Sequence, residues 1–307
     1  MIAARRGSAR GDPRRAETAK GGRVAAAVAP ISTPAALRLL VRTWNLFHGN
    51  TSPPGRTRYL ERMVRLIVED EPALVFLQEL PVFALGRLER WGGKRAFGAV
   101  ALRPRLPAEL GGRITDLRPG LFRSAFEGQA NAILVDPALD PRDHRELVLN
   151  DRMFRRREAE RLGLSLGARI AWAKERRVCH VLRVTLPGGR TSIVANLHAT
   201  SYRVDKRLAD AELLRAATFA DAIAASDEPV VLGGDFNVTV VSSPTLRALS
   251  GSEWGFSAAG PGLDHALVRG LPLARPEERW PDERRVVEGR LLSDHAPVEV
   301  ELAAPAS

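Results

Sequence analysis

Carboxylate, amide and imidazole side chains stand at the ends of apolar runs that have the length of buried strands. Five runs end in such residues, namely Asn45, Glu79, Asn196 with His198, Asp235 with Asn237, and Asp264, and the pair Asp294-His295 directly precedes a sixth. Dehydrating such a group is unfavourable unless a metal ion, a charged partner or a substrate compensates for the lost water. The repetition therefore indicates one shared polar site that could hold a cation and activate water.

The elements that must position these residues follow from the apolar patterns. Buried strands are expected over residues 39–45, 73–79, 131–135, 230–232, 263–268 and 297–302, and residues 178–186 and 191–198 form a hairpin around a Pro-Gly-Gly turn. Helices are expected over 56–70, where Pro72 stops the helix, over 151–162 and over 205–225. Residues 81–129, rich in Gly, Pro and Arg, are typical of loops over a binding face.

Length and composition indicate one large α/β domain. The chain has 307 residues, 45% of them hydrophobic, and it shows neither internal repeats nor an interior linker. We expect a disordered basic tail over residues 1–35, followed by a catalytic domain over 36–307. No apolar stretch approaches the roughly 20 residues of a membrane helix, so we expect a soluble, cytoplasmic monomer. Secretion stays open, because arginines precede the Ala-rich segment 24–29.

Charge and cysteine content exclude little beyond disulfide and thiolate chemistry. The net charge of +10 would suit a polyanion, but half of the excess lies in the first 23 residues. Arginine outnumbers lysine 42 to 4, which is a compositional bias of the whole chain and does not indicate a local basic patch. The single Cys179 excludes an internal disulfide and a metal-thiolate site. Binding to DNA or RNA is therefore allowed by the composition without being demonstrated.

Six sequence blocks, in this order, resemble the endonuclease/exonuclease/phosphatase superfamily, which includes exonuclease III, pancreatic-type deoxyribonuclease, neutral sphingomyelinase and inositol-polyphosphate phosphatases. The blocks are TWNLFHGN at 43–50, LQEL at 77–80, NLHAT at 196–200, GGDFNV at 233–238, LDHALV at 263–268 and SDHAPVEVEL at 293–302. The resemblance implies a four-layer α-β-β-α sandwich with two mostly antiparallel sheets. It also implies in-line attack of water on phosphorus.

The resemblance assigns a role to each residue. Glu79 would be the principal metal carboxylate, with Asn45 and Asp294 as further ligands of Mg²⁺ or Mn²⁺, since hard cations prefer oxygen donors. Asp235 would hold or deprotonate the attacking water, helped by Asn237. His295, paired with Asp264, would stay protonated and bind the phosphate, and His198 would face the leaving group. Asn131 and Asn196 would line the substrate-binding site.

Plainer interpretations compete with these roles. Glu79 alone could be a surface ion-pair residue, and Gly-Asp-Phe-Asn at 234–237 could equally form an Asx turn. His144, which follows three aspartates, is expected to lie among solvated loop charges rather than in a metal cluster. His198 also departs from the abasic-site endonuclease branch, where a Tyr commonly occupies this position.

We therefore expect a phosphoester substrate, with the phosphodiesters of DNA or RNA leading. A small phosphomonoester or a phospholipid headgroup is the alternative within the enzyme class. A binding protein that kept the fold and lost turnover is the alternative outside it.

Overall fold

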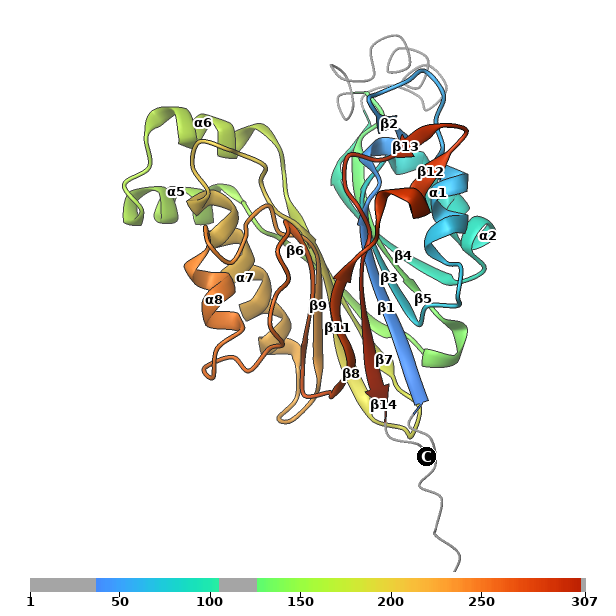
Figure 1. The fold of residues 1–307 in the computed structure, drawn as a ribbon. Helices are drawn as coiled ribbons and strands as arrows, with labels where there is room; N and C mark the ends of the chain where they lie inside the picture. The colour runs from blue at the N-terminus through green and yellow to red at the C-terminus, as the bar shows by residue number, and fades with distance from the viewer. Residues whose placement is uncertain (1–36, 105–125, 305–307) are drawn as a thin grey trace, which may run out of the picture. The chain divides into compact units, whose positions relative to one another are not determined.

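A computed structural model describes residues 37–104 and 126–304 (Figure 1). The expected tail over 1–35 lies outside the described residues, and so does the middle of the loop-rich stretch 81–129. None of the described helices combines the length and apolar character needed to cross a bilayer.

The first sheet contains Asn45, Glu79 and Asn131, the first three of the candidate site residues along the chain. In the described residues it has six strands in the order β11-β14-β1-β3-β5-β4. Their bounds are β11 Leu273–Arg279, β14 Val298–Ala304, β1 Leu37–Asn45, β3 Leu74–Leu80, β5 Gln129–Val135 and β4 Arg95–Leu102. β1 and β3 are parallel, and the other neighbours are antiparallel.

The second sheet carries most of the others. Its five described strands run in the order β10-β9-β8-β7-β6, with bounds β10 Asp264–Arg269, β9 Val230–Asp235, β8 Thr191–His198, β7 Val178–Thr185 and β6 Arg142–Val148. Again one pair, β8 with β9, is parallel. A small third sheet joins β2 Thr51–Ser52, β13 Arg290–Leu292 and β12 Val286–Val287. The expectation of two mostly antiparallel sheets is confirmed.

Side chains on both faces of each large sheet are buried, which explains the continuous apolar runs of the central strands. In β3, Leu74 and Phe76 pack between the sheets, whereas Val75 and Leu77 pack outward. The outward face lies under α1 Leu60–Ile67 and α2 Leu88–Gly92. The second sheet is covered by α7 Arg207–Ile223 and α8 Pro244–Leu249, beside α5 Arg152–Arg161 and α6 Leu166–Lys174 (Figure 1). The result is the expected four-layer α-β-β-α sandwich.

The strand directions bring the polar residues to one end of this sandwich. Asn45 pairs in register with Gln78 at the ends of the parallel strands β1 and β3, and His198 pairs with Asp235 at the ends of β8 and β9. Asp264 begins β10 opposite Asp235, because these two strands are antiparallel. The Asp294-His295 pair precedes β14, whose start lies opposite the end of β1. The topology alone therefore gathers residues that are up to 250 positions apart.

The stretch 81–129, expected to consist of loops, contains helix α2 and strand β4 in its described part, so that expectation was wrong there. The expected strands and helices are present, with shifted ends, and two of the missed strands share a cause. β6 and β11 carry charged, exposed side chains and have no apolar run, as suits strands at sheet edges. Pro276 lies within β11, a position that edge strands tolerate. Contrary to expectation, His144 lies in strand β6 rather than in a loop, and its Nε2 is 3.2 Å from His180 Nδ1.

A buried polar network joins the two sheets beneath the site. Asn196 is fully buried, and its amide nitrogen donates to the carbonyl oxygens of Leu77 and Ala132 at 3.1 and 2.9 Å. Its amide oxygen accepts from Gln78 Nε2 at 2.8 Å, and His180 Nε2 lies 3.3 Å from its amide nitrogen. Because buried amides and carbonyls need partners, Asn196 fixes the distance and register between β8 and the first sheet.

We predict that Asn196→Ala lowers the free energy of unfolding by about 2–4 kcal/mol, since several buried polar groups would lose a partner together. Urea unfolding followed by circular dichroism measures this. Val241→Ala is the matched control, because Val241 is 91% exposed and its truncation should change stability by less than about 0.5 kcal/mol. Equal stability of the two variants would remove Asn196 from the inter-sheet contact.

Candidate active site

The carboxylate of Asp235 is buried at the centre of the gathered residues. Its Oδ2 accepts a hydrogen bond from Asn45 Nδ2 at 3.0 Å and lies 3.5 Å from His198 Nε2 and 3.9 Å from His295 Nε2. Burial raises the pKa of Asp235, and the nearby Asp264 charge raises it further, while His295 and the Asn45 amide oppose the rise. Asp235 is thus more basic than an ordinary aspartate.

Two glycines allow the chain to deliver Asp235 to this position. A Cβ on Gly233 would lie 2.3 Å from the Phe76 ring, and one on Gly234 would lie 1.9 Å from the Leu197 carbonyl oxygen. After the strand, the backbone N–H of Asn237 donates to Asp235 Oδ1 at 3.0 Å, as in an Asx turn. The Asx turn and the site placement are therefore compatible, because Oδ2 is left to face the cluster.

His295 and Asp264 form a tight ion pair beside Asp235. His295 Nδ1 lies 2.7 Å from Asp264 Oδ2. Burial alone would lower the pKa of His295, but Asp264 and Asp235 outweigh it and raise the pKa to about 10. The imidazole is therefore protonated on both nitrogens at neutral pH, and its Nε2–H points toward the carboxylate of Asp235.

The loop before β14 is held in place by several hydrogen bonds. Ser293, at φ 60°, donates its hydroxyl to the Asn45 carbonyl oxygen at 2.7 Å and accepts the His295 N–H at 3.0 Å. Trp44 Nε1 donates to the His295 carbonyl oxygen at 2.8 Å, and Arg285 donates to the same oxygen at 3.2 Å. These contacts fix the backbone of His295, and the bond to Asp264 orients its ring, before any ligand binds.

His198 is buried between the two sheets and is held as a neutral ring. Its Nδ1 lies 3.1 Å from Gln129 Nε2 and 3.2 Å from an Arg177 guanidinium nitrogen. Gln129 donates, so Nδ1 accepts and the ring proton sits on Nε2, toward Asp235 and toward Glu79 Oε1 at 3.8 Å. The Arg177 nitrogen is also 3.3 Å from Nε2 and does not distinguish the two ring nitrogens. Burial, then the Arg177 charge, lowers the pKa of His198 well below its ordinary value.

Glu79 is turned into the site by an irregularity of strand β3. The register with β5 shifts between Leu77 and Leu80, and Glu79 has a left-handed backbone at φ 51°. Burial raises the pKa of its carboxyl group, the His295 charge and the Asn45 amide oppose this, and the Asp294 charge adds to it. Glu79 and Asp294 are thus like charges that act on each other in a partly dehydrated place.

That donor set fits a hard divalent cation. Glu79 and Asp294 supply carboxylate oxygens, and Asn45 supplies an amide oxygen that also accepts the Phe47 N–H at 3.0 Å. A cation between the two carboxylates would remove their mutual repulsion, which the protein groups around them offset only in part. All-oxygen ligation with exposed Asp294 on the outside suits an ion that keeps part of its water shell.

A second group, Asp235, Asp264 and His295, has ligand atoms that all lie within 4.8 Å of one another. We do not assign a metal to it. An imidazolium whose Nδ1 is bound by Asp264 and whose Nε2 carries a proton has no lone pair for a cation. The triad is better described as an ion-paired proton donor next to a buried base.

Asn196 is not free to face a ligand, whereas the amide oxygen of Asn131 is buried without a hydrogen-bond partner among the described residues. Asn196 bridges the sheets as described above, and the Asn131 amide nitrogen donates to the Val178 carbonyl oxygen at 3.3 Å. Both side chains are at most 1% exposed. We therefore leave Asn196 out of the proposed substrate-binding residues, and the substrate-binding role of Asn131 stays a prediction.

Sequence analysis missed two residues that contact His198. Gln129 begins β5 at the end of the sheet where Leu80 ends β3, and Arg177 precedes β7, whose start pairs with the end of β8. Asn150 Oδ1 accepts the Arg177 backbone N–H at 2.8 Å and fixes that turn. Only their positions in the sequence could have indicated them, since each residue lies at the start of a strand that is antiparallel to a strand ending in a site residue.

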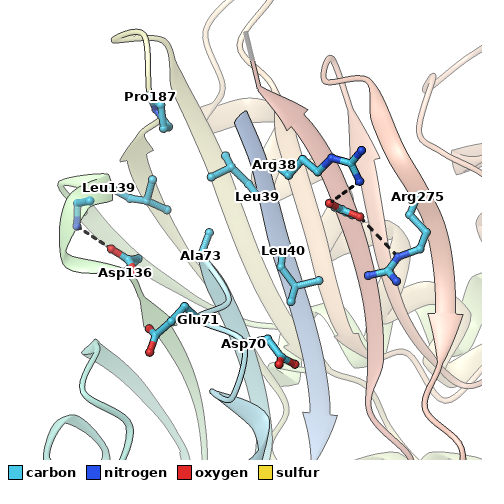
Figure 2. Close-up of a pocket in the computed structure, with 12 residues that line it drawn as sticks. Arg38, Leu39, Leu40, Asp70, Glu71, Ala73, Asp136, Leu139, Pro187 and Arg275 are labelled. Carbon is cyan, nitrogen blue, oxygen red and sulfur yellow. Dashed lines mark hydrogen bonds and ion pairs between the residues drawn. The ribbon is translucent and has the colours of Figure 1, made fainter. Parts of the chain in front are cut away.

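The pocket shown in Figure 2 lies elsewhere. It has a volume of about 360 Å³ and is lined by residues such as Leu39, Asp136, Pro187 and Arg275. Leu39 precedes Asn45 by six residues of extended strand, so the pocket lies roughly 20 Å from the site. Its charged side chains are paired, because Glu301 accepts from Arg38 at 3.3 Å and lies 3.7 Å from Arg275. It contributes nothing to the chemistry proposed below.

Solved structures of similar fold cover most of the chain. A TDP2 structure from Caenorhabditis elegans matches at 17% identity and a TM-score of 0.55, covering 87% of this chain and 75% of that one. An endonuclease/exonuclease/phosphatase from Beutenbergia cavernae matches at 16% identity and a TM-score of 0.57, with 87% and 72% covered. One from Bacteroides vulgatus matches at 14% and 0.58, with 87% and 98% covered. At these identities the likeness shows the fold alone.

Sequence comparison gives the family. None of the curated proteins matches the chain. The family model described as "Endonuclease/Exonuclease/phosphatase family" matches residues 43–295, which include every residue of the site described above. By this match, and with the sandwich and the gathered strand ends in agreement, the chain belongs to the endonuclease/exonuclease/phosphatase family.

Proposed function

We propose that residues 36–307 form a metal-dependent phosphodiesterase of the nuclease type. The observation that carries the proposal is the convergence of a buried base, Asp235, an ion-paired imidazolium, His295, and the carboxylate pair Glu79 and Asp294 at one end of the sandwich. A base, a cationic hydrogen-bond donor and a hard-cation site are the groups that attack of water on phosphorus requires.

Glu79, Asp294 and Asn45 would hold Mg²⁺ or Mn²⁺. Such an ion, when bound, neutralises negative charge that develops on the phosphate and the leaving oxygen. Asn45 has a second task, because its amide nitrogen donates to Asp235 while its amide oxygen faces away from that carboxylate. It therefore couples the position of the ion-binding end of the site to the position of the base.

Asp235 would accept the proton of the attacking water. Its raised pKa makes it a stronger base than an ordinary aspartate, and the 3.0 Å bond from Asn45 fixes which oxygen faces the water. Asn237 would act as a positioning residue. Its N–H holds Asp235 Oδ1, and its side-chain amide donates to the Ala199 carbonyl oxygen at 3.0 Å.

The two histidines would act on different oxygens of the phosphate ester. His295, kept protonated by Asp264, donates from Nε2 to a phosphate oxygen. His198, neutral with its proton on Nε2, donates to the leaving oxygen without adding a charge to the buried centre. Because the pKa of His295 is raised and that of His198 is lowered, the two rings have different charges at the same pH.

The first prediction tests turnover. Asp235→Asn and His295→Gln should each lower hydrolysis of bis(p-nitrophenyl) phosphate by about 100- to 10,000-fold, since each removes one acid or base group. Glu160→Gln is the control, because Glu160 is an exposed partner of Arg156 on α5. Assays with Mg²⁺, Mn²⁺ or EDTA, together with plasmid nicking, complete the measurement. Absent turnover on both substrates would favour a binding protein of the same fold, and turnover that persists in EDTA would contradict the role given to the cation.

The second prediction concerns the His295 pKa. Asp264→Asn removes the largest cause that raises it, so the pKa should fall from about 10 toward the ordinary value near 6.5. Imidazole nitrogen NMR of the metal-free protein as a function of pH measures the change. With the raised pKa, the pair stabilises the fold fully below about pH 6.5, and this contribution is lost as pH rises through about 10. An unchanged titration would mean that Asp264 does not govern His295.

The third prediction concerns the cation. Glu79→Gln keeps the shape of the side chain and removes its charge, so Mn²⁺ should bind at least about tenfold more weakly. Electron paramagnetic resonance of free Mn²⁺ gives the binding constant without reference to activity. Glu71→Gln is the control, because the Glu71 carboxylate is exposed and its partner is Lys94. Equal Mn²⁺ affinity of all three proteins would exclude Glu79 as a ligand.

A further inference from the structure

A pocket of about 400 Å³ opens directly beside the reacting groups. Asp264, Asp294 and His295 form one wall of this pocket, and the segment Gly260-Pro261-Gly262-Leu263 forms another. Arg203, from the turn after β8, and Arg279, at the end of β11, complete the lining. The pocket therefore spans the edges of both large sheets and shares side chains with the proposed catalytic site.

The two arginines are exposed and carry uncompensated charge. Most buried or half-buried arginines in this structure have carboxylate or carbonyl partners, as Arg42, Arg183 and Arg285 do. Within residues 37–104 and 126–304, the guanidinium groups of Arg203 and Arg279 have neither a hydrogen bond nor an ion pair. Arg279 pairs in register with Val298, which follows His295 by three positions, so this free guanidinium group lies on the strand next to the SDH loop.

Two of the three acidic residues that line the pocket, Glu277 and Asp264, already have partners. Glu277 accepts from His265 Nδ1 at 3.0 Å and from the backbone N–H groups of Gly260 and Ala266 at 2.8 Å each. Gly260 is required there, since a Cβ would lie 2.6 Å from the Glu277 carboxylate. Asp264 is paired with His295. The third, Asp294, is exposed and is a proposed ligand of the cation, so with the cation bound the charge that remains on the outer wall is that of Arg203 and Arg279.

We infer that this pocket binds a second phosphate-bearing group of the substrate, next to the phosphate that is cleaved, through Arg203 and Arg279. This rests on the proposed function and gives it a substrate class, namely phosphodiesters that carry a further phosphate one nucleotide away. Guanidinium groups bind phosphate oxygens in a forked geometry, and a volume of this size accommodates a nucleotide-sized group rather than a bare ion. A lone phosphodiester would leave both arginines unused.

The test compares the dinucleotides TpT, pTpT and TpTp with bis(p-nitrophenyl) phosphate. Wild type should hydrolyse one phosphorylated dinucleotide with a kcat/KM at least about tenfold above that for TpT. In Arg203→Ala/Arg279→Ala this preference should vanish, while kcat/KM for bis(p-nitrophenyl) phosphate changes less than about twofold. Arg203→Lys/Arg279→Lys should keep part of the preference, because lysine retains the charge without the forked geometry.

Controls separate this inference from the proposed function. Arg90→Ala, an exposed arginine on α2, should leave the preference unchanged. An equal loss on all four substrates in the double variant would overturn the inference and leave the phosphodiesterase intact, as would an intact preference. If wild type cleaves nothing, the proposed function fails, and fluorescence anisotropy of labelled pTpT and TpTp in EDTA decides on the pocket. Tighter binding of one of them than of TpT, lost in the double variant, supports the pocket, and equal binding overturns it.

Discussion

A buried carboxylate surrounded by other carboxylates is the constraint on which this structure depends. Asp235 is nearly inaccessible to water, and both Asp264 and Glu79 act to raise its pKa. Such a group is tolerated only where cationic and amide donors surround it. The protein provides Asn45 from the first sheet, His198 from the neighbouring strand, and His295 from the loop before β14. Each donor comes from a different element, so the charge balance is met only when both sheets are packed together.

The two parallel strand pairs solve this assembly problem. In a sheet whose neighbouring strands are all antiparallel, successive strands finish at opposite ends of the sheet. The two strands of a parallel pair, β1 with β3 and β8 with β9, finish at the same end. The buried network around Asn196 then holds these two edges against each other, through carbonyl groups of β3 and β5. The same contacts serve stability and site geometry, because Asn196, which links the two sheets, lies two positions before His198 on the same face of the strand.

Sequence reasoning succeeded where the physics is local. Apolar runs with polar ends predicted the central strands, and their order predicted the convergence of Asn45, Asp235, Asp264 and His295. It failed where a residue's role depends on its partner across the sandwich. Asn196 looks like a site residue because it lies two residues before His198, and only the packed sheets show that its amide is consumed by backbone groups. Arg177 was indistinguishable among 42 arginines until the pairing of β7 with β8 placed it on His198.

Backbone strain occurs at three positions next to the reacting groups, among others in the described residues. Glu79, Asn237 and Ser293 all have left-handed backbone angles, at φ 51°, 53° and 60°. For residues other than glycine, such a conformation costs roughly 1–3 kcal/mol each. Each of the three positions a reacting group. The irregularity of β3 turns Glu79 into the site, the Asn237 N–H bonds to Asp235, and the Ser293 hydroxyl accepts the His295 N–H. The rigid sheets supply the stability that offsets this strain, so the ligand-facing groups are in place before a substrate arrives. A phosphate entering the site therefore meets preset charges, and little of its binding energy is consumed in ordering the protein.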